Sequence, residues 1–199
     1  MSGTWQAGTL DRRAAVRALL HGRDGMLVVS GLGSPSYDVF AAGDHGGNFY
    51  LWGAMGGAAL VGLGLALAQP ARPVLVVTGD GEALMGLGGL ATIGARRPPN
   101  LGVVVLDNGR YGETGMQASH TALGVDLCGV ARAAGFASVA EAADLDGIAA
   151  IRPGLSEILG GPRFAVVRIA PDEVPRALPM RDGVALKLRL RAHLGFRPE

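Results

Sequence analysis

Short runs of apolar residues alternate along the chain with segments in which apolar positions recur at helical spacing. The runs predict buried strands at Met26–Ser30, Pro73–Thr78, Leu101–Leu106 and Phe164–Ile169. Strands that are apolar on both faces are typical of a parallel sheet covered by helices on its two sides. We therefore predict an α/β fold, a doubly wound, mostly parallel sheet with helices on both faces.

Helical patterns fill the intervals between these strands. The first predicted helix has Thr9 as its N-cap, and the second has Pro35 in its first turn, where proline is favoured. Because no internal repeat or long linker interrupts the pattern, we expect residues 1–199 to form a single domain. The predicted helices are Thr9–His21, Ser34–Ala42, Leu51–Ala68, Glu82–Ala95, Val125–Ala134, Leu145–Leu159 and Gly183–Leu194.

One predicted helix, Leu51–Ala68, is eighteen residues long and uncharged, which reaches the length of a membrane-spanning segment. More than half of it is alanine or glycine, which contribute little insertion energy, and Arg72 is the only basic residue near its ends. The charged N-terminal segment also lacks the apolar stretch of a secretory signal. We expect a buried helix, no membrane association and a cytoplasmic location.

Composition removes several classes of function. The formal net charge is +1, so no overall field favours nucleic acid. The basic run KLRLRAHLGFR near the C-terminus alternates its charges with leucines, which favours a docking helix over a nucleic-acid surface. Cys128 is the only cysteine, which excludes a disulfide framework and a metal cluster held wholly by cysteines of this chain. We expect it to be a small buried apolar residue.

Candidate chemistry follows two of the predicted strands. Gly79-Asp80-Gly81 comes directly after one strand, and Asp107-Asn108-Gly109 comes after the next. A right-handed crossover would bring Asp80 and Asn108 to the same edge of the sheet. Their oxygens are hard ligands that suit Mg2+, while flanking glycines and a helix N-terminus would allow close approach of a diphosphate. Each motif alone is also a common turn, so the indication comes from their combination.

The residues around these motifs resemble a known family. The segment GDGEALMGLGGLATIGARRPPNLGVVVLDNGRYG looks like the thiamine-diphosphate motif, which begins with GDG and ends with an asparagine. NFYLWGAMGGAALVGLGLALA and LDNGRYGETGMQASHT extend the likeness to the cofactor-binding part of sulfopyruvate decarboxylase and phosphonopyruvate decarboxylase. The resemblance covers roughly Met26 to Phe136. It implies thiamine diphosphate and Mg2+ as cofactors.

The resemblance also implies residue roles. Asp80 and Asn108 would give side-chain oxygens to Mg2+, and Arg110 would give its backbone carbonyl. Met55 would wedge beneath the bent cofactor, although a helix methionine is more often ordinary core packing. The remaining implied cofactor contacts are Gly33, Ser34, Gly79, Gly81, Glu82, Ala83, Tyr111 and Gly112.

Two positions depart from the family pattern. Position 82 is usually serine in this family and is Glu82 here, which would bring a like charge beside the diphosphate. We therefore expect its side chain to face solvent or a partner. The usual Asn-Asn pair is Asp107-Asn108 in this sequence.

The activity that the resemblance implies is decarboxylation of a small anionic 2-oxoacid, similar to 3-sulfo- or 3-phosphonopyruvate, to an aldehyde and carbon dioxide. The glutamate that activates the cofactor lies on a pyrimidine-binding domain in this family, so we expect a pyrimidine-binding (alpha) subunit as partner in a heteromer. His120 is the candidate catalytic residue, with Thr114, Gln117 and the Arg110 side chain as other candidates for substrate contact. A loop histidine without substrate contact is the alternative for His120.

Other functions remain open at this point. An acetolactate-synthase-like carboligase would use the same cofactor, and a non-catalytic cofactor-binding partner subunit would keep the fold alone. A Rossmann dehydrogenase does not fit, because GLGSPS lacks the third glycine and no acid is placed for the ribose.

Overall fold

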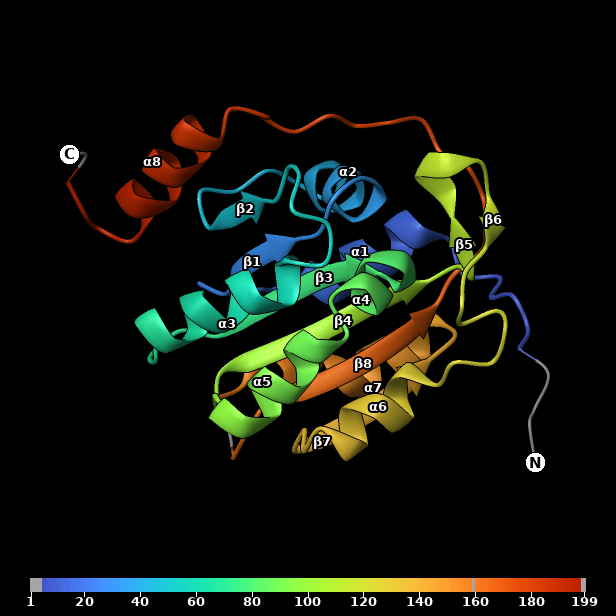
Figure 1. Ribbon diagram of the computed structural model, residues 1–199. Helices are drawn as coiled ribbons and strands as arrows, with labels where there is room; N and C mark the ends of the chain where they lie inside the picture. The colour runs from blue at the N-terminus through green and yellow to red at the C-terminus, as the bar shows by residue number, and fades with distance from the viewer. Residues whose placement is uncertain (1–4, 159, 198–199) are drawn as a thin grey trace.

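The computed structural model describes residues 5–158 and 160–197, and a six-stranded parallel sheet runs through its centre (Figure 1). The strand order is β2-β1-β3-β4-β8-β7, and every neighbouring pair is parallel. This confirms the predicted α/β class. The strands are β1 (Leu27–Ser30), β2 (Asn48–Tyr50), β3 (Val74–Gly79), β4 (Leu101–Asp107), β7 (Ser138–Ala142) and β8 (Arg163–Arg168).

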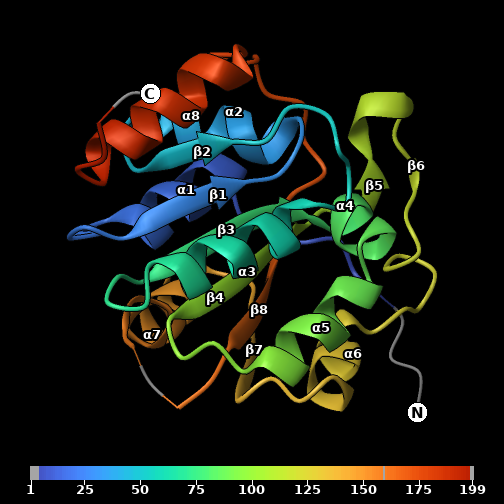
Figure 2. The ribbon, with the colours of Figure 1, turned by 60° about the vertical axis from the view of Figure 1, so that its left-hand side comes forward.

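Helices cover both faces of the sheet (Figure 2). On one face, apolar residues of α1, α2 and α7 form a core with β1, β3, β4 and β8. On the other face, α3, α5 and α6 form a second core with the same strands. The helices are α1 (Arg12–Leu20), α2 (Ser34–Ala41), α3 (Ala58–Ala68), α4 (Asp80–Met85), α5 (Gly88–Arg96), α6 (Leu127–Ala133), α7 (Leu145–Ser156) and α8 (Gly183–His193). The C-terminal α8 packs beside β2, so the basic run is part of a docked helix.

Two strands at the edges of the sheet were not predicted. β2 has only three residues and follows a polar, glycine-rich segment, so it lacks the apolar run that marks the other strands. β7 has the sequence SVAEA, and four of its five residues are exposed or half-buried. Edge strands need fewer apolar residues because one side has no neighbouring strand, and hydropathy therefore misses them.

Two predicted helices have different bounds in the structure. The segment Leu51–Ala68 is helical only from Ala58, because Gly53, Ala54 and Gly56 have positive φ angles of 77°, 49° and 90°. The segment Glu82–Ala95 is two helices, which separate at Gly86. A Cβ atom on Gly86 would lie 2.1 Å from the carbonyl oxygen of Gly56, so the two loops touch backbone to backbone there.

The remaining helices begin and end close to their predicted limits. α1 begins at Arg12, and its N-cap is Asp11 rather than Thr9, because the Asp11 carboxylate accepts a hydrogen bond from the backbone of Ala14. α7 ends at Ser156, and Leu159, the predicted end, lies outside the described residues.

Buried polar side chains secure the edge of the sheet where the strands begin. The Asn100 amide donates hydrogen bonds to the carbonyls of Ala66, Gln69 and Arg72, which ties the end of α3 to the start of β4. Arg163, at the start of β8, donates to the carbonyl of Glu157 at 2.9 Å. These bonds satisfy backbone acceptors at a helix end, which would otherwise be costly to bury.

A small addition lies at the opposite edge, where the strands end. An antiparallel pair, β5 (Arg110–Tyr111) and β6 (Gln117–Ala118), with the short 3-10 helix η1 (Gly112–Thr114) between its strands, projects beyond β4. β1 lies between β2 and β3, so the chain changes direction at this strand, and ligands of doubly wound sheets bind at such points.

Among the described residues, no helix has the length and apolar character needed to cross a membrane.

Candidate active site

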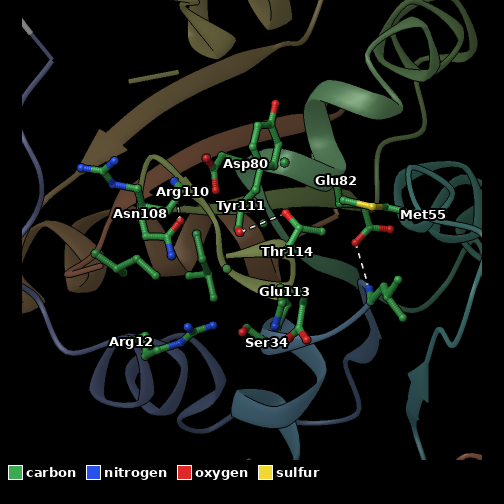
Figure 3. A pocket seen from close by; sticks show the side chains of 17 residues that line it. Arg12, Ser34, Met55, Asp80, Glu82, Asn108, Arg110, Tyr111, Glu113 and Thr114 are labelled. Carbon is green, nitrogen blue, oxygen red and sulfur yellow. Dashed lines mark hydrogen bonds between the residues drawn. The ribbon is translucent and has the colours of Figure 1, made fainter. Parts of the chain in front are cut away.

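A cavity of about 140 Å³ opens at this edge, beyond the ends of β3 and β4 (Figure 3). Loops after β1, β3 and β4 contribute to its wall, together with the segment before α3 and the start of α1. Eleven of the residues that the sequence marked line it: Ser34, Met55, Gly79, Asp80, Gly81, Glu82, Asn108, Arg110, Tyr111, Gly112 and Thr114.

Asp80 is the first residue of α4 and is buried, with 2% of its surface exposed. The Ser119 hydroxyl donates a hydrogen bond to its Oδ2 atom, and Thr121 Oγ1 lies 3.3 Å from the same oxygen. Burial raises the pKa of Asp80 to about 6, the Ser119 hydrogen bond opposes this rise, and the nearby Asp107 carboxylate adds to it. Two carboxylates therefore meet at the strand ends, an arrangement that a cation would stabilise.

Asp107 stabilises the loop that carries Asn108. Its Oδ1 atom accepts hydrogen bonds from the backbone of Gly109 at 2.9 Å and from the hydroxyl of Thr121 at 2.8 Å. Its Oδ2 atom accepts a hydrogen bond at 2.6 Å from the guanidinium of Arg168, the last residue of β8. Since its oxygens are engaged in this way, Asp107 orients the turn after β4, and Asn108 is the residue of the pair that lines the cavity.

The donor set at this point suits a hard cation. Asp80 and Asn108 both line the cavity and offer a carboxylate and an amide oxygen, and the carbonyl of Arg110 belongs to the same loop. The Asn108 Oδ1 atom accepts a hydrogen bond from the backbone of Arg110 at 3.0 Å, which folds the loop around the asparagine. Oxygen-only donors of this kind are those that Mg2+ prefers.

Small residues and an aromatic ring shape the adjacent wall. A Cβ atom on Gly81 would lie 2.8 Å from the ring of Tyr111, so only glycine allows this close packing. Met55 follows Ala54, one of the few non-glycine residues with positive φ, and 42% of its surface is exposed. It extends over the cavity near Gly81 rather than into either core. Ordinary core packing therefore does not account for Met55.

The expectation that Glu82 faces solvent or a partner is wrong. Its side chain is buried, with 5% of the residue exposed, and its carboxylate accepts hydrogen bonds from the backbone of Leu32 and the hydroxyl of Thr78, both at 3.0 Å. The backbone of Ala58 donates to the other oxygen at 3.3 Å. Burial raises the pKa of Glu82, and these three donors oppose the rise.

Space for this carboxylate comes from Gly31, because a Cβ atom there would lie 1.7 Å from Glu82 Oε2. Glu82 therefore joins the loop after β1, the end of β3 and the start of α3. It is a structural cross-link at the back of the cavity.

Four of the residues that the sequence marked do not line the cavity: Gly33, Ala83, Gln117 and His120. The Ala83 side chain lies on the far side of α4, beside Thr78 and Leu90. Gly33 is the N-cap of α2 with a φ of 74°, and it is buried, with the Glu113 carboxylate close to it. His120 is exposed, and its Nδ1 atom lies 3.0 Å from the hydroxyl of Tyr111, through which it reaches the cavity. Its catalytic role stays a prediction.

Sequence reasoning missed several residues at the site. Arg12, on α1, lines the cavity, and the hydroxyls of Ser119 and Thr121 donate hydrogen bonds to the carboxylate of Asp80. Glu113 also lines it, and Arg176 pairs with its carboxylate at 3.1 Å. No local motif marks Arg12, since it lies in an amphipathic helix pattern. Ser119 and Thr121 fall within the segment that resembled the family, but nothing in it distinguished structural hydroxyls from substrate contacts.

Comparison with known proteins defines the class. Residues 39–169 match the family described as "Thiamine pyrophosphate enzyme, C-terminal TPP binding domain". The chain therefore belongs to the thiamine pyrophosphate enzymes, and the matched part contains Met55, Asp80 and Asn108.

Two relatives show which branch of this family the chain is similar to. Phosphonopyruvate decarboxylase of Streptomyces viridochromogenes is 43% identical over 166 residues, and the match covers 75% of this chain but only 40% of that protein. Sulfopyruvate decarboxylase subunit beta of Methanothermobacter thermautotrophicus is 40% identical over 162 residues, which cover 81% of this chain and 83% of the relative. The chain thus spans about two fifths of the first relative and most of the second.

Solved structures agree on the fold. Benzoylformate decarboxylase from Polynucleobacter necessarius superposes with a TM-score of 0.69 and 22% identity, over 83% of this chain and 34% of the other. A 2-oxoglutarate:ferredoxin oxidoreductase from Magnetococcus marinus superposes with a TM-score of 0.65 and 18% identity, over 94% of this chain and 77% of the other.

Proposed function

We propose that this chain is the thiamine-diphosphate- and Mg2+-binding subunit of a two-chain 2-oxoacid decarboxylase, with residues 1–199 as one domain. The substrate is similar to 3-sulfo- or 3-phosphonopyruvate, and the products are an aldehyde and carbon dioxide. The observation that carries the proposal is the convergence of Asp80, Asn108 and Met55 on one cavity in a chain of this family.

In this proposal Asp80 and Asn108 hold Mg2+ by side-chain oxygens, together with the Arg110 carbonyl. The glycines Gly79, Gly81 and Gly112 leave room for the diphosphate, which needs close approach to the backbone. Thiamine diphosphate, when bound, supplies the electron sink that a 2-oxoacid needs to lose carbon dioxide. The protein contributes binding, orientation and charge.

The glutamates of the cavity support a partner chain. Glu82 is held by three hydrogen bonds, and Glu113 is an exposed loop residue that pairs with Arg176, so the described residues that line the cavity include no buried glutamate without a protein partner. Relatives of similar length are named as a beta subunit, which supports a second polypeptide that supplies this glutamate. We propose a pyrimidine-binding (alpha) subunit in that position.

Arg110 and Thr114 line the cavity, and His120 contacts Tyr111 at its rim. Arg110 is exposed, and its guanidinium has no hydrogen-bond partner among the described residues, so it is available to an anionic substrate. We assign His120 and Arg110 to orientation of the substrate. A carboligase of the acetolactate-synthase type would use the same cavity with a second carbonyl compound.

The test is decarboxylation of a panel of 2-oxoacids that includes sulfopyruvate, phosphonopyruvate and pyruvate. Each is supplied with thiamine diphosphate and Mg2+ to this chain alone and to the chain co-expressed with its genomic neighbour. Activity only in the co-expressed sample supports the proposal and identifies the substrate. Cofactor binding without carbon dioxide release in either sample would favour a carboligase or a non-catalytic subunit.

A further inference from the structure

Arg12 is a cationic side chain of the cavity to which the proposed function gives no role. It is 7% exposed, and its Nε atom donates to Asp38 Oδ2 at 2.6 Å. Its two terminal nitrogens have no hydrogen-bond partner in the part of the chain that the structure describes, although the residue lines the cavity. Figure 3 shows the guanidinium directed toward Ser34. Guanidinium nitrogens that open onto a cavity and have no protein partner are ready donors to an anion.

The helix α2 explains this direction. Asp38 and Ser34 are four residues apart and therefore lie on the same face of α2, one turn from each other. Since Asp38 holds Arg12 by its Nε atom, the other nitrogens extend toward the first turn, where Ser34 lies. The N-cap of α2, Gly33, has no side chain that could satisfy the backbone amides of that turn. A helix N-terminus of this kind attracts anions.

Charge at this point is incompletely balanced. Arg13 Nε lies 3.6 Å from Asp38 Oδ1, so two guanidinium groups share one buried carboxylate. An excess positive charge in a poorly solvated position is unfavourable until an anion joins it. The carboxylate of Glu113 lies close to Gly33 at the start of α2, but its side chain is 43% exposed and pairs with Arg176. Rotation of this exposed side chain would open the position.

We propose that Arg12 is a further anion-binding residue of this cavity: beside the Ser34 hydroxyl and the first turn of α2, where the family resemblance already implies cofactor contacts, its guanidinium completes a binding seat for a tetrahedral oxyanion. A planar guanidinium gives two parallel hydrogen bonds to a phosphate, phosphonate or sulfonate group, and the hydroxyl and helix end add further donors. Two molecules of the proposed function carry such a group: the cofactor, through its terminal phosphate, and the substrate, through its second anion. The identity of the molecule rests on the proposed function, whereas the seat itself does not.

The seat is tested on the full chain with inorganic phosphate and no added metal ion. The melting temperature is measured against phosphate concentration for the wild type, Arg12→Gln and the matched control Arg13→Gln. Arg13 is adjacent on α1 and contacts the same Asp38, but it does not line the cavity. We expect the apparent dissociation constant for phosphate to rise at least tenfold in Arg12→Gln and less than twofold in Arg13→Gln. Arg12→Gln could fold poorly because it leaves Asp38 without this partner. In that case the double variant Arg12→Gln/Asp38→Asn, which removes both charges, is measured in place of the single variant.

Two further measurements identify the molecule. A tenfold rise in the dissociation constant of thiamine diphosphate with Mg2+ in Arg12→Gln assigns the seat to the cofactor. An unchanged cofactor constant, with a tenfold rise in KM for sulfopyruvate but not for pyruvate in the co-expressed enzyme, assigns it to the substrate.

The inference is overturned if phosphate leaves the wild-type melting temperature unchanged, or if Arg12→Gln matches Arg13→Gln in all three measurements. Absence of thiamine diphosphate binding by the wild type would instead reject the proposed function, and the phosphate titration would still decide the seat.

Discussion

Glu82 accepts a hydrogen bond from the backbone of Leu32, fifty residues away in the sequence, at 3.0 Å. This bond joins α4 to the loop after β1, and the same carboxylate also holds the start of α3 through Ala58. The position of two cavity walls therefore depends on one buried side chain. A glutamate at a position where the family usually has serine is thus accommodated in the fold, because three protein donors hold its carboxylate.

Replacement of Glu82 with glutamine should destabilise the protein. Both carboxylate oxygens accept hydrogen bonds from backbone N–H groups, and a glutamine must place its own N–H₂ group against one of them. We expect a loss of about 1–3 kcal/mol in the free energy of unfolding, measured by urea denaturation. Glu113→Gln is the control, since Glu113 is exposed and should change stability by less than about 0.5 kcal/mol. Equal stability of the two variants would show that the cross-link is unimportant.

Asp80→Ala should remove Mg2+-dependent binding of thiamine diphosphate. The Asp80 carboxylate is the only charged ligand in the proposed set, so calorimetric titration should show a loss of about 100-fold or more in affinity. The fold should persist, because the change also removes a carboxylate that lies near Asp107. Ser119→Ala, which removes the hydroxyl donor to Asp80, should weaken binding by about 10-fold. Unaltered affinity in Asp80→Ala would refute the metal assignment.

Met55→Ala should slow turnover more than it weakens cofactor binding. The side chain extends over the cavity, and a misplaced cofactor lowers the rate on the order of 10- to 100-fold. Because 42% of Met55 is exposed, the melting temperature should change little. Leu60→Ala is a suitable control, since Leu60 has a similar exposure of 44% and lies outside the cavity. A lowered melting temperature with normal turnover would identify Met55 as a packing residue instead.

Cys128 should react slowly with thiol reagents in the folded protein. The residue is 1% exposed, and burial raises the pKa of its thiol to about 12, so little of the reactive thiolate forms at neutral pH. Labelling by iodoacetamide at pH 8 should be at least about 10-fold slower than in urea-unfolded protein. Rapid labelling of the folded chain would show that α6 opens readily.

Hydropathy was a good guide to the centre of the sheet and a poor guide to its edges. The four apolar runs became β1, β3, β4 and β8, since strands buried on both faces have a continuous apolar signal. β2 and β7 have no such signal. Asp80 and Asn108 were predictable because strand order and crossover handedness bring consecutive strand ends together.

The role of Glu82 and the presence of Arg12 in the cavity were not predictable from the sequence. A buried carboxylate is stabilised by donors distant in sequence, here Leu32 and Ala58, and by the space left at Gly31. Arg12 reaches the cavity only because Asp38 holds it against α2. Both depend on tertiary contacts between elements that no local pattern specifies.

The side chains that anchor the beginning of the strands have a consequence for how this protein tolerates change. Asn100 and Arg163 secure helix ends and loops where β4 and β8 begin, at the opposite edge of the sheet from the cavity. Substitutions where the strands begin should therefore change the stability of the fold and hence the amount of folded protein in the cell. Substitutions where the strands end should change the activity of each folded molecule. If Arg110 and His120 orient the substrate as proposed, substitutions around them can change substrate choice while the contacts of Asn100 and Arg163 are kept.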